Sequence, residues 1–235
     1  MNILAIDTSS KYSGIAFYQS ERSDYPFLSI VEEEKTRAEN MLPRLQELMD
    51  KSELTFDQVD LIAVCKGPGS FTGLRIGVTI AKTMAQFSGK NIVGISSLEA
   101  LAYMAGEREE LICPIIDARA NRVYGGLYSW KKGELEELLP ENLYFEEDLK
   151  ERISTFSGKD LVFVGEGISF HPALEGNSGV KEKILLSSPV KGICQLAERK
   201  AKKGLFDSPL HFAPNYLRKS QAEMERERLA NKKSC

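Results

Sequence analysis

Apolar residues near the start of the chain fall in short runs of strand length. These runs lie at residues 2–7, 14–18, 27–31 and 60–65. Residues 39–51 instead carry apolar side chains at three- and four-residue spacing, which is typical of an amphipathic helix. The pattern therefore predicts three strands, a helix and a further strand, in that order.

The pattern of strands begins again in the second half. A helix is expected at 97–105, and a charged loop after Gly106 separates it from the next strand. The expected elements are then strands at 111–116, 122–130, 134–139, 160–164 and 183–186, and a helix at 189–203. Three strands followed by alternating helices and strands is the order of a ribonuclease H-like lobe in an α/β protein. We predict two such lobes, residues 1–105 and 106–217, and a basic, flexible tail at 218–235.

A glycine-rich run joins the strand at 60–65 to another helical stretch. It reads KGPGSFTGLRIG at residues 66–77, and Ser70 or Thr72 is expected to cap the helix. A strand, glycine loop and helix can present free backbone N–H groups to an anion. The run matches neither GxxxxGK[ST] nor GxGxxG, since Leu74 follows Gly73 and Thr72 replaces a third glycine. A phosphate-binding turn and a turn that only allows close helix packing are both open.

Composition excludes several classes of protein. Lys and Arg number 31 and Asp and Glu number 34, for a formal net charge of -3, which argues against a surface that grips nucleic acid throughout. The predicted tail at 218–235 is the exception to this charge balance, because its Lys and Arg residues outnumber its Glu residues. No apolar stretch approaches the roughly 20 residues that span a bilayer. We expect a cytoplasmic protein without membrane attachment.

Cysteine and histidine spacing indicates no metal site. The four cysteines, which show no CxxC spacing and are expected to be reduced thiols, are Cys65, Cys113, Cys194 and Cys235. The histidines, His171 and His211, lie far apart in the chain, and we expect surface or turn residues there instead of ligands.

Five segments together resemble the TsaB (YeaZ) family. They are AIDTSS at 5–10, GPGSFTGLRIG at 67–77, GISSLEAL at 94–101, DAR at 117–119 and PNYLRKSQAE at 214–223. The segments occur in the family's order and span nearly the whole chain. The resemblance implies an actin-like, Hsp70-like ATPase (ASKHA) fold, with two ribonuclease H-like lobes whose mixed five-stranded sheets are flanked by helices.

The resemblance also implies a function. Such a protein is a subunit without catalytic residues of its own, required for making threonylcarbamoyladenosine at the adenosine 3′ of the anticodon, in tRNAs that read codons beginning with adenine. It would bind the catalytic subunit TsaD and the ATPase TsaE, form a homodimer when TsaD is absent, and meet tRNA only through the complex. ATP and a metal belong to TsaD and TsaE, and no cofactor is required by this chain.

Proteins of the resembled superfamily hold a nucleotide between their lobes. The residues that match those loops are Asp7, Ser9, Gly67, Gly69, Ser70, Thr72, Asp117, Gly165 and Gly167. The loops at 7–10 and 117–119 lack the glycines that let a backbone approach a phosphate closely. We therefore expect a degenerate site in which Asp7 and Asp117 are structural caps. Further candidates, as phosphate contacts or salt-bridge partners, are Arg75, Arg119 and Arg122.

Two helices carry apolar stripes that suit either their own sheet or a partner protein. The resemblance favours a partner, because TsaB proteins pair through amino-terminal helices. The predicted interface residues are Met41, Leu45, Met49, Arg75, Thr79, Lys82, Thr83 and Gln86.

An enzyme that acts alone is the alternative, either a glycoprotease-like peptidase or a kinase-like phosphotransferase. A peptidase needs a metal pair or an activated nucleophile, and no histidine stands in a recognisable relation to Ser70 or Thr72. A phosphotransferase would need magnesium-dependent ATP binding by the isolated chain.

Overall fold

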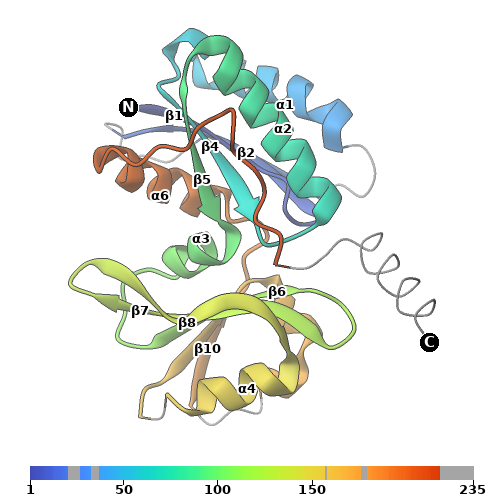
Figure 1. Ribbon diagram of the computed structural model, residues 1–235, viewed down its shortest axis with the longest axis vertical. Coiled ribbons are helices and arrows are strands. Elements are labelled where there is room, and N and C mark those ends of the chain that lie inside the picture. The colour runs from blue at the N-terminus through green and yellow to red at the C-terminus, as the bar shows by residue number, and fades with distance from the viewer. Residues whose placement is uncertain (21–26, 33–36, 157, 176–178, 218–235) are drawn as a thin grey trace, which may run out of the picture.

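The computed structural model describes residues 1–20, 27–32, 37–156, 158–175 and 179–217. Two lobes are stacked along the long axis of the molecule, and each contains one five-stranded sheet (Figure 1). The predicted α/β class with two mixed sheets is confirmed.

The first sheet lies in the amino-terminal lobe. Its strands are β1 (Asn2–Asp7), β2 (Tyr12–Gln19), β3 (Phe27–Glu32), β4 (Leu61–Gly67) and β5 (Asn91–Ser96), in the order β3-β2-β1-β4-β5. β1 pairs antiparallel with β2 and parallel with β4, and β4 pairs parallel with β5. This arrangement matches the ribonuclease H-like order predicted from the pattern.

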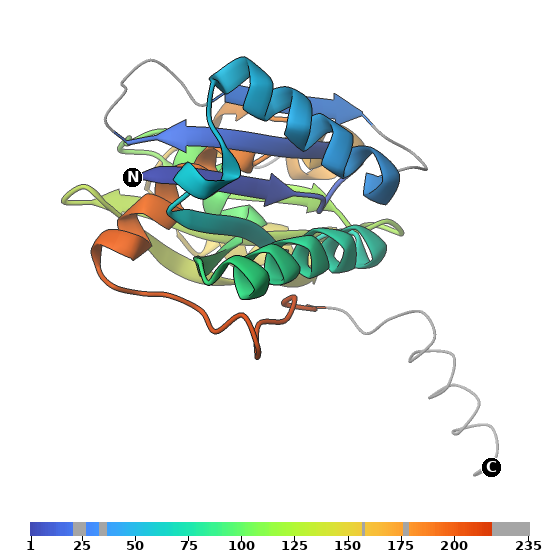
Figure 2. The same ribbon diagram turned by 90° about the horizontal axis from the view of Figure 1, so that it is seen from above.

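Both faces of the first sheet are covered, because successive side chains of a strand point to opposite faces. Leu4 and Ile6 pack with α1 (Arg37–Ser52) and α2 (Phe71–Ser88). Ile3 and Ala5 pack with α6 (Val190–Lys202) on the other face. In Figure 2, which views the first lobe from above, α1 and α2 lie in front of the sheet and α6 lies behind it.

The apolar stripe of α1 belongs to this core. Met41 is 1% exposed and Leu45 is 6% exposed, and both pack with the sheet residues Leu4 and Ile6. The prediction that Met41 and Leu45 contact a partner is therefore wrong. Leu42, on the same helix, is 59% exposed.

The second sheet repeats the plan of the first. Its strands are β6 (Leu111–Asp117), β7 (Arg122–Lys131), β8 (Glu134–Phe145), β9 (Leu161–Val164) and β10 (Val180–Ile184), in the order β10-β9-β6-β7-β8. The short helices α4 (Glu146–Ser154) and α5 (Pro172–Glu175) lie on one face, where Leu149 and Leu174 join the core. α3 (Ser97–Met104) covers the other face and lies between the lobes (Figure 1).

The chain returns to the first lobe after the second sheet. α6 packs on β1, β2, β4 and β5, and Asp207 forms a bridge with Ile92 of β5. The sequence pattern places everything from 106 to 217 in the second lobe. The structure differs because the parallel strands of the first sheet must be buried on both faces, and α6 supplies the second layer.

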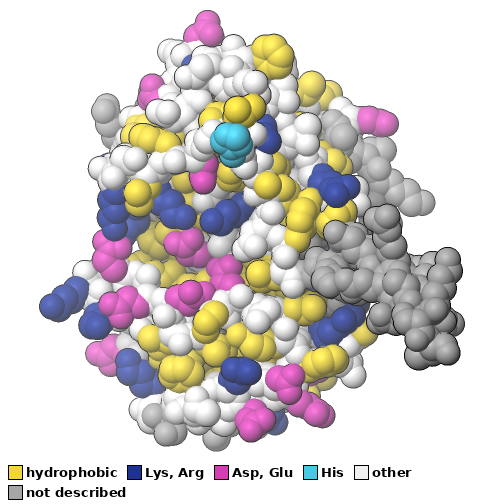
Figure 3. All heavy atoms as spheres, in the orientation of Figure 1, with side chains coloured by type: hydrophobic (Ala, Val, Ile, Leu, Met, Phe, Trp, Pro, Cys, Tyr) yellow, Lys and Arg dark blue, Asp and Glu magenta, His cyan; other side chains and the backbone are white. Residues whose placement is uncertain are grey.

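Ionic contacts join the lobes where α6 passes the β7–β8 hairpin. Arg199 lies 3.0 Å from Glu134 and donates to the Gly133 carbonyl at 2.9 Å, and Lys203 lies 3.2 Å from Glu134. Figure 3 shows basic side chains along the lower edge of the first lobe facing acidic ones across the junction.

Within the described part of the chain, no helix is long and apolar enough to cross a membrane. Cys65, Cys113 and Cys194 are buried free thiols, as expected. Cys235 and the predicted basic tail lie outside the described residues.

Candidate functional site

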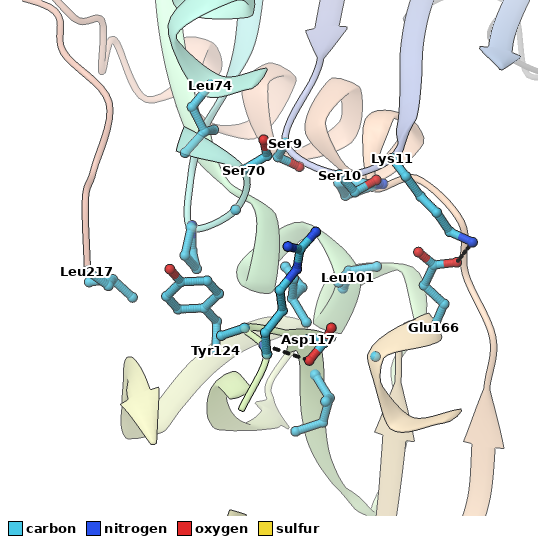
Figure 4. A pocket seen from close by; sticks show the side chains of 18 of the residues that line it. Ser9, Ser10, Lys11, Ser70, Leu74, Leu101, Asp117, Tyr124, Glu166 and Leu217 are labelled. Carbon is cyan, nitrogen blue, oxygen red and sulfur yellow. Dashed lines mark hydrogen bonds and ion pairs between the residues drawn. The ribbon is translucent and has the colours of Figure 1, made fainter. Parts of the chain in front are cut away.

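A cavity of about 530 Å³ opens between the two lobes (Figure 4). Its walls come from the turn after β1, the glycine loop, α3, the β6–β7 turn and the carboxyl-terminal segment, which is defined here as residues 203–217. Of the predicted nucleotide-site residues, those that line it are Ser9, Gly69, Ser70, Asp117 and Gly167. Asp7, Gly67, Thr72 and Gly165 are not among its lining residues.

Asp7 is a buried structural group at the end of β1. Its carboxylate accepts hydrogen bonds from Ser9 N at 2.9 Å, Ser9 Oγ at 2.7 Å and Ser188 Oγ at 2.9 Å. Burial raises the pKa of Asp7, and the hydrogen bonds from Ser9 and Ser188 act in the opposite direction. The carboxylate therefore ties β1 to the segment that enters α6, in keeping with the predicted role as a cap.

The glycine loop packs closely against the turn after β1. Ser70 N donates to the Ser9 carbonyl at 2.6 Å, and a Cβ added at Gly69 would collide with that same carbonyl oxygen. Ser70 Oγ accepts from Gly73 N at 3.3 Å, which confirms Ser70 as the cap of α2.

Thr8 makes the next contact along the same helix. Its hydroxyl donates to Gly73 O at 2.6 Å and accepts from Gly77 N at 3.1 Å, and a Cβ at Gly77 would collide with Thr8 Oγ1. The glycines of α2 thus serve the close packing of the helix on β1. Of the two alternatives left open for the loop, the structure favours close packing.

The carboxyl-terminal segment covers the outer side of the same loop. Asn215 N donates to the Lys66 carbonyl at 2.6 Å, and Gly67, at a φ of 108°, leaves room for the Asn215 carbonyl. Tyr216 stacks on Phe71 with ring centroids 4.5 Å apart. Sequence reasoning missed this contact, because it joins residues that lie far apart in the chain.

The loop that resembles an adenosine loop also packs on protein atoms. A Cβ at Gly165 or Gly167 would lie 2.6 Å from the Ile115 carbonyl oxygen, and one at Gly167 would lie 2.8 Å from Asp117 N. These glycines bring the loop against β6.

His171 is buried, at 3% exposure, so it is not the surface residue that we allowed for, but it does lie in the turn that precedes α5. Its Nε2 lies 3.1 Å from Asp117 Oδ1 and its Nδ1 lies 3.4 Å from Glu146 Oε2. Asp117 Oδ1 also accepts from Arg119 N at 2.8 Å, so this carboxylate caps the β6–β7 turn. The imidazole fills the space between two carboxylates that the sequence places far apart.

The β6–β7 turn has an unusual backbone. Arg119, Ala120 and Asn121 have φ angles of 62°, 54° and 55°, in the left-handed region that residues with a Cβ seldom adopt. Of the three candidate arginines, only Arg119 lines the cavity. Arg75 lies over the Phe71 ring and donates from Nε to Tyr216 Oη at 3.1 Å.

A second candidate surface is the outer side of α2. Four of its predicted interface residues are exposed: Arg75, Thr79, Thr83 and Gln86. Lys82 is partly buried and donates to the Phe212 carbonyl at 2.8 Å. Phe87, at the end of the same helix, is 89% exposed. Met49 of α1 packs partly against the first lobe's core.

Known proteins resemble this chain over most of its length. A family model described as TsaD, tRNA N6-adenosine threonylcarbamoyltransferase, matches residues 31–226. The tRNA threonylcarbamoyladenosine biosynthesis protein TsaB of Bacillus subtilis (strain 168) is 36% identical over 171 residues, 73% of each chain. TsaB of Escherichia coli (strain K12) is 28% identical over 232 residues, 94% of this chain and 96% of its own.

The fold has a solved counterpart. The structure of YeaZ from Pseudomonas aeruginosa superposes with a TM-score of 0.79 at 24% identity, covering 92% of this chain and 99% of that one. The predicted actin-like, Hsp70-like ATPase fold is thus confirmed. With the family model and the Bacillus relative taken together, the chain belongs to the TsaB (YeaZ) family, in the superfamily that also contains TsaD.

Proposed function

We propose that this chain is a non-catalytic subunit of the cytoplasmic machinery that makes threonylcarbamoyladenosine in tRNA. Its task is to bind and stabilise TsaD, which transfers the threonylcarbamoyl group to the adenosine 3′ of the anticodon, and to help recruit TsaE. The observation that carries this proposal is that the glycine loops of the chain are packed against its own atoms.

A phosphate could bind at these loops only if their present packing were disrupted. Ser70 N, at the start of α2, already donates to the Ser9 carbonyl, and Gly69, Gly165 and Gly167 lie against backbone oxygens. Asp7, one of the residues that match the superfamily's nucleotide loops, is buried and accepts three hydrogen bonds. These features support a chain that needs no nucleotide or metal of its own.

The outer side of α2 is the surface proposed for TsaD. Thr79, Thr83 and Gln86 expose uncharged side chains on a helix whose other face packs in the core of the first lobe. Phe87 adds a large apolar side chain at 89% exposure. We propose that the same surface forms a homodimer when TsaD is absent, and that tRNA is met through the complex.

The proposal is tested by mixing the purified chain with TsaD, separating the mixture by size-exclusion chromatography and measuring the mass of each peak by light scattering. A one-to-one complex, together with no ATP turnover by the isolated chain, is the expected result. Separate elution of the two proteins would contradict the scaffold role. Magnesium-dependent ATP turnover by the isolated chain would support the kinase-like alternative instead.

A further inference from the structure

We propose that the cavity between the lobes binds a small organic molecule with one carboxylate beside an apolar group, and that Arg119 holds the carboxylate. This ligand site is separate from the proposed scaffold role, which uses the outer side of α2.

The backbone presents Arg119 at the cavity in a strained conformation. Three consecutive residues with a Cβ, Arg119 to Asn121, occupy the left-handed region, which Asn tolerates but which is unfavourable for Arg119 and Ala120. Backbone strain of this kind persists where the surroundings enforce it, and it concentrates at ligand sites. The turn therefore indicates a function for the side chain that it carries.

The surroundings do enforce the turn. Asp117 Oδ1 accepts from Arg119 N, and His171 in turn holds the same oxygen at 3.1 Å. Glu146 N donates to the Asn121 carbonyl at 3.1 Å, so α4 begins directly on the turn. The β6–β7 turn at the cavity wall is thus held by the buried imidazole of His171 and by the first turn of α4.

The Arg119 guanidinium is available to a ligand. Arg119 is exposed and lines the cavity, and among the described residues no ion-pair or hydrogen-bond partner of its guanidinium is found. Arg199 and Arg108, by contrast, pair with Glu134 and Glu182. A guanidinium presents a planar fork that matches a carboxylate with two parallel hydrogen bonds.

The charge of the cavity selects the kind of anion. The charged residues that line it, Lys11, Arg119, Asp117 and Glu166, carry two positive and two negative formal charges, and Lys11 lies 3.8 Å from Glu166. A polyphosphate would place several negative charges beside the carboxylates of Asp117 and Glu166. A ligand with a single negative charge meets less of that repulsion.

The apolar part of the lining is the reason that we assign an apolar group to the ligand. Apolar and aromatic side chains form much of the wall, among them Leu101, Ile116, Tyr124, Phe170 and Leu186. A cavity of about 530 Å³ is within the size range of small-molecule sites. Ser187 adds a hydroxyl group that can pair with an amide or hydroxyl of the ligand. An N-acyl amino acid combines these features: one carboxylate, one amide and one apolar side chain.

The test uses the full chain and matched probes. N-acetyl-L-leucine carries the carboxylate, and N-acetyl-L-leucinamide has nearly the same shape without the charge. Binding of each is measured by calorimetric titration, along with ATP and magnesium. The variants are Arg119→Gln and, as a control outside the cavity, Arg152→Gln on α4. Because both arginines are exposed, the variants should keep the wild-type unfolding temperature.

We expect saturable binding of N-acetyl-L-leucine, no saturation by the amide, and an affinity reduced about tenfold or more in Arg119→Gln but unchanged in Arg152→Gln. Equal binding of acid and amide, equal affinity of the Arg119→Gln variant, or tighter binding of ATP than of the acid would overturn the assignment. Failure of the acid to saturate wild-type protein would overturn it as well. None of these outcomes changes the association with TsaD, so this site and the scaffold role are judged separately.

Discussion

At the scale of single residues, the glycines are where the sequence is most informative and most ambiguous. The run at 66–77 predicts a tight turn before a helix, and the turn is there, capped by Ser70. What the sequence cannot tell is what occupies the space beside each glycine. At Gly69 the occupant is the Ser9 carbonyl, and at Gly67 it is Asn215, more than a hundred residues further along. These two glycines of the run therefore serve internal packing.

Replacing Gly69 with alanine tests whether the loop is closely packed. The added methyl group would collide with the Ser9 carbonyl, so we expect a loss of about 1–3 kcal/mol in the free energy of unfolding, measured with urea. Thr72→Ala, at an exposed position of the same segment, should cost less than about 0.5 kcal/mol. Equal stability of Gly69→Ala and wild type would show that the loop has free space.

The cap of α2 gives a second prediction at this scale. Ser70→Ala removes the hydroxyl that accepts from Gly73 N, which should cost about 1 kcal/mol of unfolding free energy. Ser70→Asp keeps an acceptor at the helix start and should retain most of the stability. If alanine and aspartate lower the stability equally, the hydroxyl is not acting as a cap.

At the scale of elements, hydrophobic periodicity predicts the helices and strands well but not what their apolar faces contact. The stripe of α1 is clear in the sequence, yet Met41 and Leu45 cover the first sheet and not a partner. A stripe only says that one side must be buried. Whether it is buried inside the chain or against another protein depends on which other helices are available to cover the sheet, and that is a property of the tertiary structure.

The outer side of α2 can be tested by introducing charge where the fold does not need the side chain. Thr83→Glu and Gln86→Glu should weaken the association with TsaD about tenfold or more, because an unpaired charge would be buried at the interface, while thermal unfolding stays unchanged. Ser169→Glu, an exposed change in the second lobe, should leave the affinity as in wild type. Unaltered binding by both α2 variants would place the partner surface elsewhere.

At the scale of the whole molecule, the two-lobe plan follows from the repeated order of strands, but the path of the chain does not. α6 belongs by sequence position to the second half and by packing to the first lobe. The return of the chain joins the lobes, and a partly buried carboxyl group adds to the junction. Glu141 of β8 accepts hydrogen bonds from Ser96 Oγ, at the cap of α3, and from Tyr128 Oη of β7.

This junction predicts a dependence of stability on pH. Burial raises the pKa of Glu141, the nearby charges of Glu137 and Glu99 raise it further, and the hydrogen bonds from Ser96 and Tyr128 lower it. The folded protein therefore holds this proton more tightly than the unfolded chain does. The contribution of Glu141 to stability is largest below the usual carboxyl pKa and is lost as the pH rises through the raised value.

Glu141→Gln keeps the hydrogen-bond acceptor and removes the titration. The unfolding free energy of the variant, relative to wild type, should rise as the pH is raised above the usual carboxyl pKa of about 4.3. Glu151→Gln, at an exposed position on α4, is the matched control and should show no such trend. Parallel pH profiles of Glu141→Gln and wild type would contradict the role assigned to the Glu141 carboxyl.

The proposed role of this chain is to support a modification that another subunit catalyses. The most direct measurement is the amount of threonylcarbamoyladenosine formed on tRNA by TsaD, TsaE and the enzyme that supplies the threonylcarbamoyl adenylate, with and without this chain. We predict product only when the chain is present, and none from the chain without TsaD. Full modification in its absence would contradict the account.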